Sequence, residues 1–73
     1  MARKQGIGDR VRAARVELGW SQRGLSEYSG VSQTGICLIE TGRRSPTDAT
    51  LGPIAAALGR RLEWVRYGTG AES

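Results

Sequence analysis

Two short helices in succession are predicted by residues 19–46, GWSQRGLSEYSGVSQTGICLIETGRRSP. Ser21 and Ser32 are suitable N-cap residues, because a serine hydroxyl accepts hydrogen bonds from the free N–H groups of the first helical turn. One apolar residue precedes each serine and another follows four positions later, the spacing of a hydrophobic staple; these pairs are Trp20 with Leu25 and Val31 with Ile36. A glycine follows each segment, as expected where a helix ends in a left-handed residue. We therefore expect two helices joined by a tight turn within residues 21–41.

Three further helices are predicted from the spacing of apolar residues. Apolar side chains recur at helical intervals in residues 7–18, 51–58 and 62–67, and a glycine follows each of these segments as well. Pro53 fits the first turn of its helix if Thr50 is the N-cap, because no intrahelical donor is lost there. No stretch alternates with period two over a useful length, so no strand is expected. The predicted fold class is all-α, a compact five-helix bundle.

Length and charge narrow the range of partners. The 73 residues are enough for one small domain, here residues 1–73, with an ordered core over about residues 7–68. Eleven Lys+Arg against seven Asp+Glu give a net charge of +4, and all the basic residues except Lys4 are arginine. Arginine suits bidentate contacts to phosphate and guanine. A basic domain of this size has nucleic acid or an anionic membrane as its expected charged partner, and charge alone does not separate the two.

Absent residue types exclude most catalytic and metal chemistry. The chain has no histidine and one cysteine, Cys37. This composition excludes imidazole acid–base catalysis, histidine metal sites, an internal disulfide and zinc sites built on paired thiolates. The Gly-X-Gly segments at residues 6–8 and 68–70 are too short for a phosphate-binding fingerprint. We expect no enzymatic activity, no cofactor and no metal. With neither a disulfide nor an apolar run near ~18 residues, we expect a cytoplasmic protein without a membrane partner.

The pair of short helices resembles the phage repressor and Cro type of helix-turn-helix domain. The residues that carry the resemblance are GWSQ at 19–22, LS at 25–26, GVS at 30–32 and IETGRRSP at 39–46. The similarity extends over about residues 7–70, nearly the whole chain. It implies the lambda-repressor-like five-helix fold and a second short helix that enters the DNA major groove.

The resemblance also implies which residues meet DNA. The expected base contacts lie at the start and along one face of the third helix: Ser32, Gln33, Thr34 and Leu38. Gln33 can pair bidentately with adenine N6 and N7, and Leu38 can contact a thymine methyl group. The expected phosphate contacts are Gln22, Thr41, Arg43 and Arg44. Simpler alternatives stay open: an N-cap role alone for Ser32, core packing for Leu38, a helix-forming role alone for Gln22, and a solvated loop for the two arginines.

Four further expectations concern structure rather than DNA. In the resembling family, residues corresponding to Arg15 and Glu40 form an ion pair between helices, and we expect the same pair here without a direct function. Cys37 is expected to be a small, half-buried side chain, with a redox sensor as the alternative. Ser26 replaces the usual alanine, and its small size should preserve packing. The residues at 60–61, two arginines, replace an apolar residue and an N-cap, so that the last helix either frays at its start or directs arginine toward phosphate or a partner subunit.

The resemblance implies a sequence-specific regulator of transcription that binds double-stranded DNA. The expected protein is a phage- or prophage-type repressor that binds a palindromic operator as a homodimer, with half-sites ~34 Å apart. The dimer surface is expected on the last helix and consists of Glu63, Trp64 and Arg66. Because the sequence ends at Ser73, we expect dimerisation to be weak and assisted by DNA. The alternatives are a restriction-modification controller, an antitoxin that binds a partner protein, and a membrane-surface protein with a basic first helix.

Overall fold

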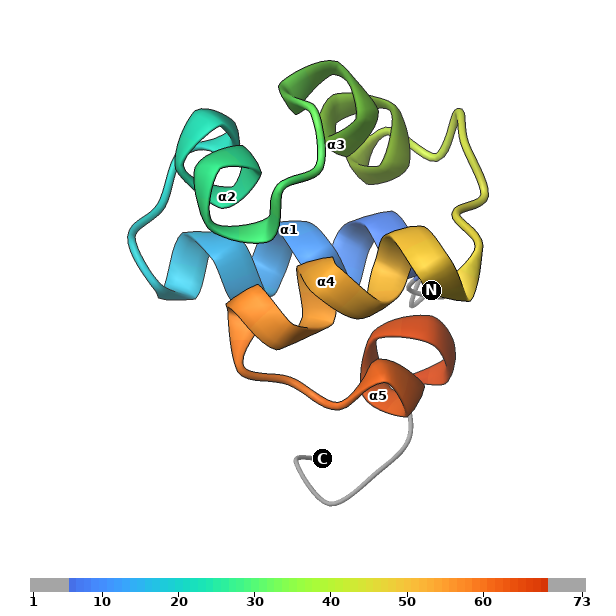
Figure 1. Cartoon of the computed structure of the whole chain (residues 1–73). Coiled ribbons are helices and arrows are strands. Elements are labelled where there is room, and N and C mark those ends of the chain that lie inside the picture. Colours follow the sequence, from blue (N-terminus) through green and yellow to red (C-terminus); the bar gives the residue numbers. More distant parts are fainter. Residues whose placement is uncertain (1–5, 69–73) are drawn as a thin grey trace, which may run out of the picture.

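The computed structural model describes residues 6–68, and in that range it contains five helices and no strand (Figure 1). The helices are α1 (Ile7–Glu17), α2 (Gln22–Ser29), α3 (Gln33–Glu40), α4 (Asp48–Leu58) and α5 (Leu62–Tyr67). The all-α, five-helix prediction is therefore confirmed. Residues 1–5 and 69–73 lie outside the described part of the chain, and with them the last residues of the sequence resemblance.

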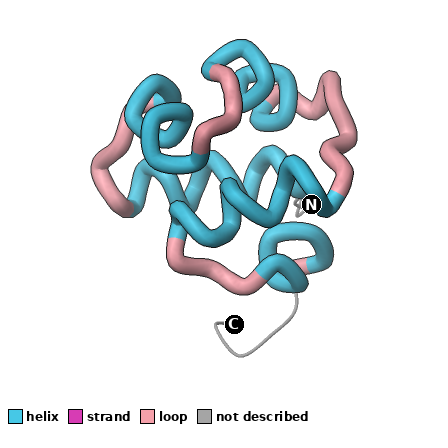
Figure 2. Tube along the Cα trace, in the orientation of Figure 1, coloured by secondary structure: helices cyan, strands magenta, loops and turns pink. Residues whose placement is uncertain are grey.

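Helices α1 and α4 lie across the middle of the molecule, and the other three helices pack on two sides of this pair. Figure 1 shows α2 and α3 on one side and α5 on the other, in agreement with the contacts between elements. The loops between the helices are short (Figure 2). The core contains apolar side chains from all five helices: Val11, Ala14, Leu25, Ile36, Ile39, Leu51, Ile54, Ala55, Leu58 and Val65. This packing leaves the outer face of α3 exposed.

The predicted helix ends and caps are present. All five glycines that follow a helical segment have φ between 70° and 79°; they are Gly19, Gly30, Gly42, Gly59 and Gly68. The Ser21 hydroxyl accepts from Gly24 N at 3.0 Å, and the Ser32 hydroxyl accepts from Gly35 N at 3.0 Å. The apolar residues before these caps, Trp20 and Val31, pack against the core as a hydrophobic staple requires.

The predicted start of the fourth helix was wrong. The N-cap is Thr47 rather than Thr50, so α4 begins a turn earlier and Pro53 lies in its interior. The earlier start places Asp48 in the first turn, where a negative charge is favourable beside the helix N-terminus. Proline lacks the N–H that would reach the Ala49 carbonyl, but both residues are exposed, so water can reach that carbonyl.

Arginine side chains hold α5 against the rest of the bundle. Arg10, which the sequence analysis did not single out, is 8% exposed and donates to the carbonyls of Val65 at 2.9 Å and Arg66 at 2.8 Å. These carbonyls end α5, so the cation sits where the helix dipole favours positive charge. Arg60 pairs with Glu17 at 2.6 Å and lies 4.7 Å from the Trp64 ring centroid.

The Arg60 contacts bear on the start of the last helix, which the sequence analysis expected either to fray or to direct arginine toward phosphate or a partner subunit. They anchor the residues before α5 to the end of α1 and to the α5 aromatic ring, and α5 begins at Leu62 with Arg61 in the N-cap position.

None of the five described helices has the length and apolar character needed to cross a membrane.

Candidate nucleic-acid interface

Helix α3 has one face in the core and one face in solvent. Gly35, Ile36 and Ile39 are buried, whereas Gln33, Thr34 and Cys37 are exposed. The half-buried environment expected for Cys37 was therefore wrong. The reason is the helical period: once Ile36 and Ile39 face the core, Cys37, the residue directly after Ile36, turns outward.

A groove of about 330 Å³ lies between the start of α2 and the outer face of α3. Its lining residues are Gln22, Gln33, Thr34, Cys37 and Leu38. The structure thus brings together three of the four residues expected to contact bases and one expected to contact phosphate. Ser32, the fourth, is exposed at the N-cap of α3. Cys37 is the groove residue that the sequence analysis missed, although its position one turn after Thr34 on the same helix was a usable signal.

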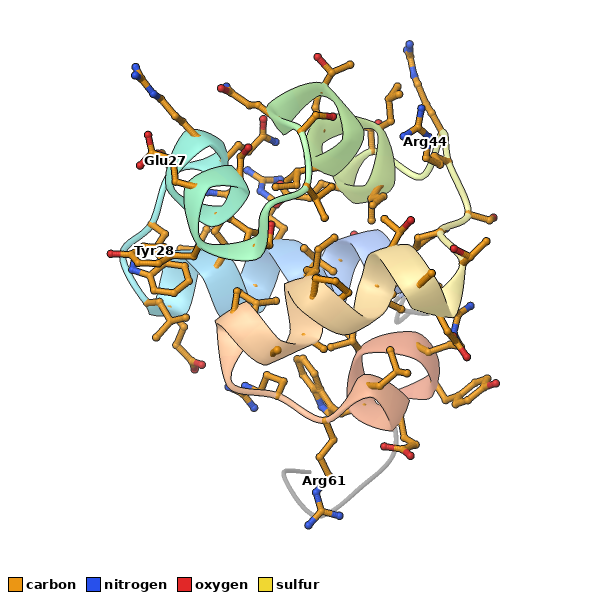
Figure 3. All side chains as sticks on the ribbon, in the orientation of Figure 1. Glu27, Tyr28, Arg44 and Arg61 are labelled. Carbon is orange, nitrogen blue, oxygen red and sulfur yellow. The ribbon has the colours of Figure 1, made fainter. Side chains whose placement is uncertain are left out.

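The remaining expected phosphate contacts follow α3 directly. Thr41, Arg43 and Arg44 are all exposed, and Arg44 lies at the α3 end of the molecule (Figure 3). The backbone N–H groups of both arginines donate to the Leu38 carbonyl, at 2.9 and 3.2 Å, which fixes the start of this loop. The Thr41 hydroxyl donates to the Cys37 carbonyl at 2.9 Å, so it must rotate before it can donate to a phosphate oxygen.

The expected pair of Arg15 and Glu40 is present and is bidentate. Arg15 Nε lies 2.7 Å from Glu40 Oε2, and Arg15 Nη2 lies 3.0 Å from Oε1. The side chains are 11% and 2% exposed, so the pair is largely shielded from water. The hydrogen bond to Glu40 raises the pKa of Arg15, an effect that burial opposes, and the guanidinium stays charged.

The same carboxylate has a second partner that the sequence analysis did not predict. Gln22 Nε2 donates to Glu40 Oε1 at 3.0 Å, and Arg15 Nη1 donates to the Trp20 carbonyl at 2.8 Å. These contacts join α1, the start of α2 and the end of α3. One edge of the groove is therefore built on a buried ion pair.

This geometry agrees with comparisons to known proteins. The helix-turn-helix family HTH_3 matches residues 11–65. The chain belongs to this family. In the helix-turn-helix of this protein, α2 is the first helix and α3 is the second, which carries most of the groove residues.

The relatives include repressors and a controller protein. The HTH-type transcriptional repressor RghR of Bacillus subtilis (strain 168) is 39% identical over 67 residues, which cover 90% of this chain and 50% of that protein. The chain thus spans about half the length of this curated relative. The P22 c2 repressor protein in complex with synthetic operator 9T matches with a TM-score of 0.85 at 29% identity, covering 90% of this chain and 100% of that one.

A third comparison bears on the alternative functions. The restriction-modification controller protein C.AhdI from Aeromonas hydrophila matches with a TM-score of 0.77 at 27% identity, covering 81% of this chain and 89% of that one. The backbone arrangement is therefore similar to that of a repressor and to that of a controller protein.

Hydrogen bonds fix the turn of the helix-turn-helix. The Ser26 hydroxyl donates to the Val31 carbonyl at 2.6 Å, and Val31 N–H donates to the Ser29 hydroxyl at 3.2 Å. Both polar groups of Val31 are thus bound by serines of α2. Ser26 therefore does more than preserve packing: it ties the chain that enters α3 to the middle of α2.

We expect Ser26→Ala to lower the free energy of unfolding by about 1 kcal/mol, because the part-buried Val31 carbonyl loses its donor. The midpoint of thermal unfolding, followed by circular dichroism, should fall by roughly 4–8 °C. Ser45→Ala is the matched control, since Ser45 is exposed in the loop after α3. Equal midpoints for the two variants would show that the Ser26 bond does not stabilise the turn.

The residues expected at a dimer surface are on α5, which lies across α1 and α4 from α2 and α3 (Figure 1). Glu63 is exposed, whereas Trp64 is half-buried against the core. Arg66 lies 2.8 Å from the Asp48 carboxylate and donates to the Pro46 carbonyl at 2.8 Å. Contacts within the chain thus account for the large aromatic ring and for this arginine.

Proposed function

We propose that this protein binds double-stranded DNA at specific sequences through α3 and represses transcription. The proposal rests on the groove that Gln22 and the outer face of α3 form. Hydrogen-bonding and apolar side chains lie together there on an exposed helix. The major groove of B-DNA is about 12 Å wide and admits one α-helix. The similarity to a repressor crystallised with its operator supports the proposal.

The residues of α3 and its N-cap have one role in this proposal, and Gln22 together with the residues after α3 has another. Ser32, Gln33, Thr34 and Leu38 read base edges: the Gln33 amide pairs with adenine, and Leu38 contacts a thymine methyl group. The half-buried position of Leu38 on the groove wall suits an apolar contact of this kind. Gln22, Thr41, Arg43 and Arg44 contact phosphates and set the position of α3 on the duplex.

We expect Arg44→Gln to weaken binding to every duplex by a similar factor and to reduce the slope of log K against log salt concentration by about 1, because one phosphate contact is lost. Fluorescence anisotropy with labelled duplex over a range of salt concentrations measures both quantities. Arg61→Gln is the matched control, since Arg61 lies at the opposite end of the molecule (Figure 3). A slope equal to wild type for Arg44→Gln would remove Arg44 from the interface.

We further propose that the protein acts in the cytoplasm as a homodimer, with Glu63, Trp64 and Arg66 of α5 at or beside the contact. Tyr67 on the same helix is 69% exposed and adds apolar surface there. A two-fold dimer requires a palindromic site with half-sites about ten base pairs apart. Selection of bound duplexes from a random pool should yield such a motif, and sedimentation on that duplex should give two chains per DNA. A single chain on the selected duplex would contradict the dimer.

A second candidate is a restriction-modification controller, favoured by the similarity to C.AhdI. Both candidates bind DNA through α3, so binding measurements on this chain do not separate them. The location of the selected motif does: a controller is expected to bind in front of restriction-modification genes, and a repressor of phage type is not.

A further inference from the structure

Glu40 has a second partner besides Arg15, which a purely structural ion pair does not need. Its side chain is 2% exposed, and it holds Gln22, which lines the groove on α3. We infer that Glu40 is a positioning residue for DNA binding, which fixes the Gln22 amide in one orientation before DNA arrives. This inference rests on the proposed function and assigns a role to a residue that does not itself touch DNA.

The orientation of the Gln22 amide follows from the chemistry of its partner. A carboxylate only accepts hydrogen bonds, so the amide nitrogen must face Glu40 and the amide oxygen must face away. One hydrogen of Nε2 is used in this bond, and the second is free to meet an acceptor such as a phosphate oxygen. Gln22 is also the first residue of α2, where backbone N–H groups favour an anion. Side chain and backbone thus point to the same ligand.

Arg15 makes this arrangement compatible with DNA. A lone carboxylate behind a phosphate-binding residue would repel the phosphate, but Arg15 neutralises Glu40 through two hydrogen bonds. Arg15 Nη1 also donates to the Trp20 carbonyl, two residues before Gln22. The network therefore fixes both the backbone that starts α2 and the side chain that faces DNA.

Preorganisation is the expected source of the effect on affinity. A free glutamine side chain loses rotamer freedom when it meets a ligand, and this loss weakens binding. In this protein the bond to Glu40 restricts Gln22 in the unbound state. Removing Glu40 should therefore weaken binding through Gln22, and only while Gln22 is present.

A double-mutant cycle tests this dependence. The four proteins are wild type, Gln22→Ala, Glu40→Gln and the double variant, and the probe is the duplex that wild type selects from a random pool. Binding is measured by anisotropy at a temperature where circular dichroism shows all four proteins folded. Gln22→Ala, which loses the proposed bond to a charged phosphate, should raise Kd by about tenfold or more, and Glu40→Gln, which only frees the Gln22 side chain, should raise it by about fivefold. In the Gln22→Ala background, Glu40→Gln should change Kd by less than about twofold.

Each other outcome has a defined meaning. An equal increase in Kd from Glu40→Gln in both backgrounds would reduce Glu40 to a structural residue and overturn the inference. An unchanged Kd for Gln22→Ala, together with a raised Kd for Gln33→Ala, would overturn the inference but leave the proposed function standing. If wild type selects no duplex, the proposed function itself fails.

A second measurement on the wild-type protein keeps the inference testable if Glu40→Gln does not fold. The Gln22 side-chain proton that is bonded to Glu40 should exchange with solvent more slowly than the side-chain NH₂ protons of Gln33, because of these two amides the Gln22 amide donates to a buried carboxylate. Equal exchange rates in ¹⁵N–¹H spectra of the free protein would overturn the proposed orientation.

Discussion

Gly8→Ala is expected to lower the free energy of unfolding by about 3 kcal/mol, because α1 meets the end of α3 with no room for a side chain. A methyl carbon at Gly8 would overlap the Ile39 carbonyl oxygen and would lie 2.7 Å from the Glu40 carbonyl oxygen. Both obstacles are backbone atoms, so relief requires a shift of one helix against the other. The midpoint of thermal unfolding should fall by about 15 °C.

Gly24→Ala is the matched control for Gly8→Ala. Gly24 also lies within a helix, α2, and a methyl group there would make only ordinary van der Waals contacts, with the Ser21 hydroxyl oxygen at 3.5 Å and Trp20 Cβ at 3.7 Å. Alanine has the better helix propensity, so this variant should gain about 0.5–1 kcal/mol. A loss of stability in both variants, of similar size, would contradict close packing at Gly8 as the cause.

The largest expected effect on binding comes from Gln33→Ala. Loss of a bidentate amide–adenine pair should cost about 1–3 kcal/mol, which is roughly a 5- to 150-fold increase in Kd for the selected duplex. Affinity for a shuffled duplex should change little, because Gln33 is proposed to read a base and not the backbone. Gln33 is exposed and caps no helix, so the free energy of unfolding should stay close to that of wild type.

The contrast with Arg44→Gln separates the two classes of contact. Gln33→Ala should reduce the ratio of affinities for selected and shuffled duplex and leave the salt dependence unchanged. Arg44→Gln should leave this ratio unchanged and reduce the salt dependence. Anisotropy titrations of both variants against both duplexes, over a range of salt concentrations, give the affinity ratios and the salt dependence. An equal loss of affinity for both duplexes in Gln33→Ala would assign Gln33 to the backbone.

Local signals in the sequence predicted most of the fold. Serine caps, apolar staples and glycines after helices act within a few residues. The cap roles of Ser21 and Ser32 and the helix end at Gly30 could therefore be predicted without knowledge of the tertiary structure. The residues that line the groove on α3, except Cys37, were expected as DNA contacts through the resemblance of the whole helix-turn-helix segment. The start of α4 was missed because Pro53 suggested a first turn, and exposure of the proline makes an interior position tolerable.

Contacts between distant segments were out of reach of the same reasoning. Arg10 and Val65 are 55 positions apart, and nothing in the local sequence around Arg10 indicates that it binds the end of α5. The close approach of Gly8 to α3 is equally invisible in a segment that otherwise has ordinary helical spacing. The pair of Arg15 and Glu40 was expected only through the family, and its extension to Gln22 became visible only in three dimensions.

The central claim is that α3 reads DNA sequence, and the ratio of two dissociation constants tests it most directly. The wild-type protein is titrated by anisotropy, near physiological salt, against the duplex it selects from a random pool and against a shuffled duplex of the same composition. A specific DNA-binding protein is expected to prefer its site by at least about a thousandfold, and steep salt dependence should accompany both titrations. Equal dissociation constants for the two duplexes would mean that only the backbone is bound, and would contradict the role assigned to the groove on α3.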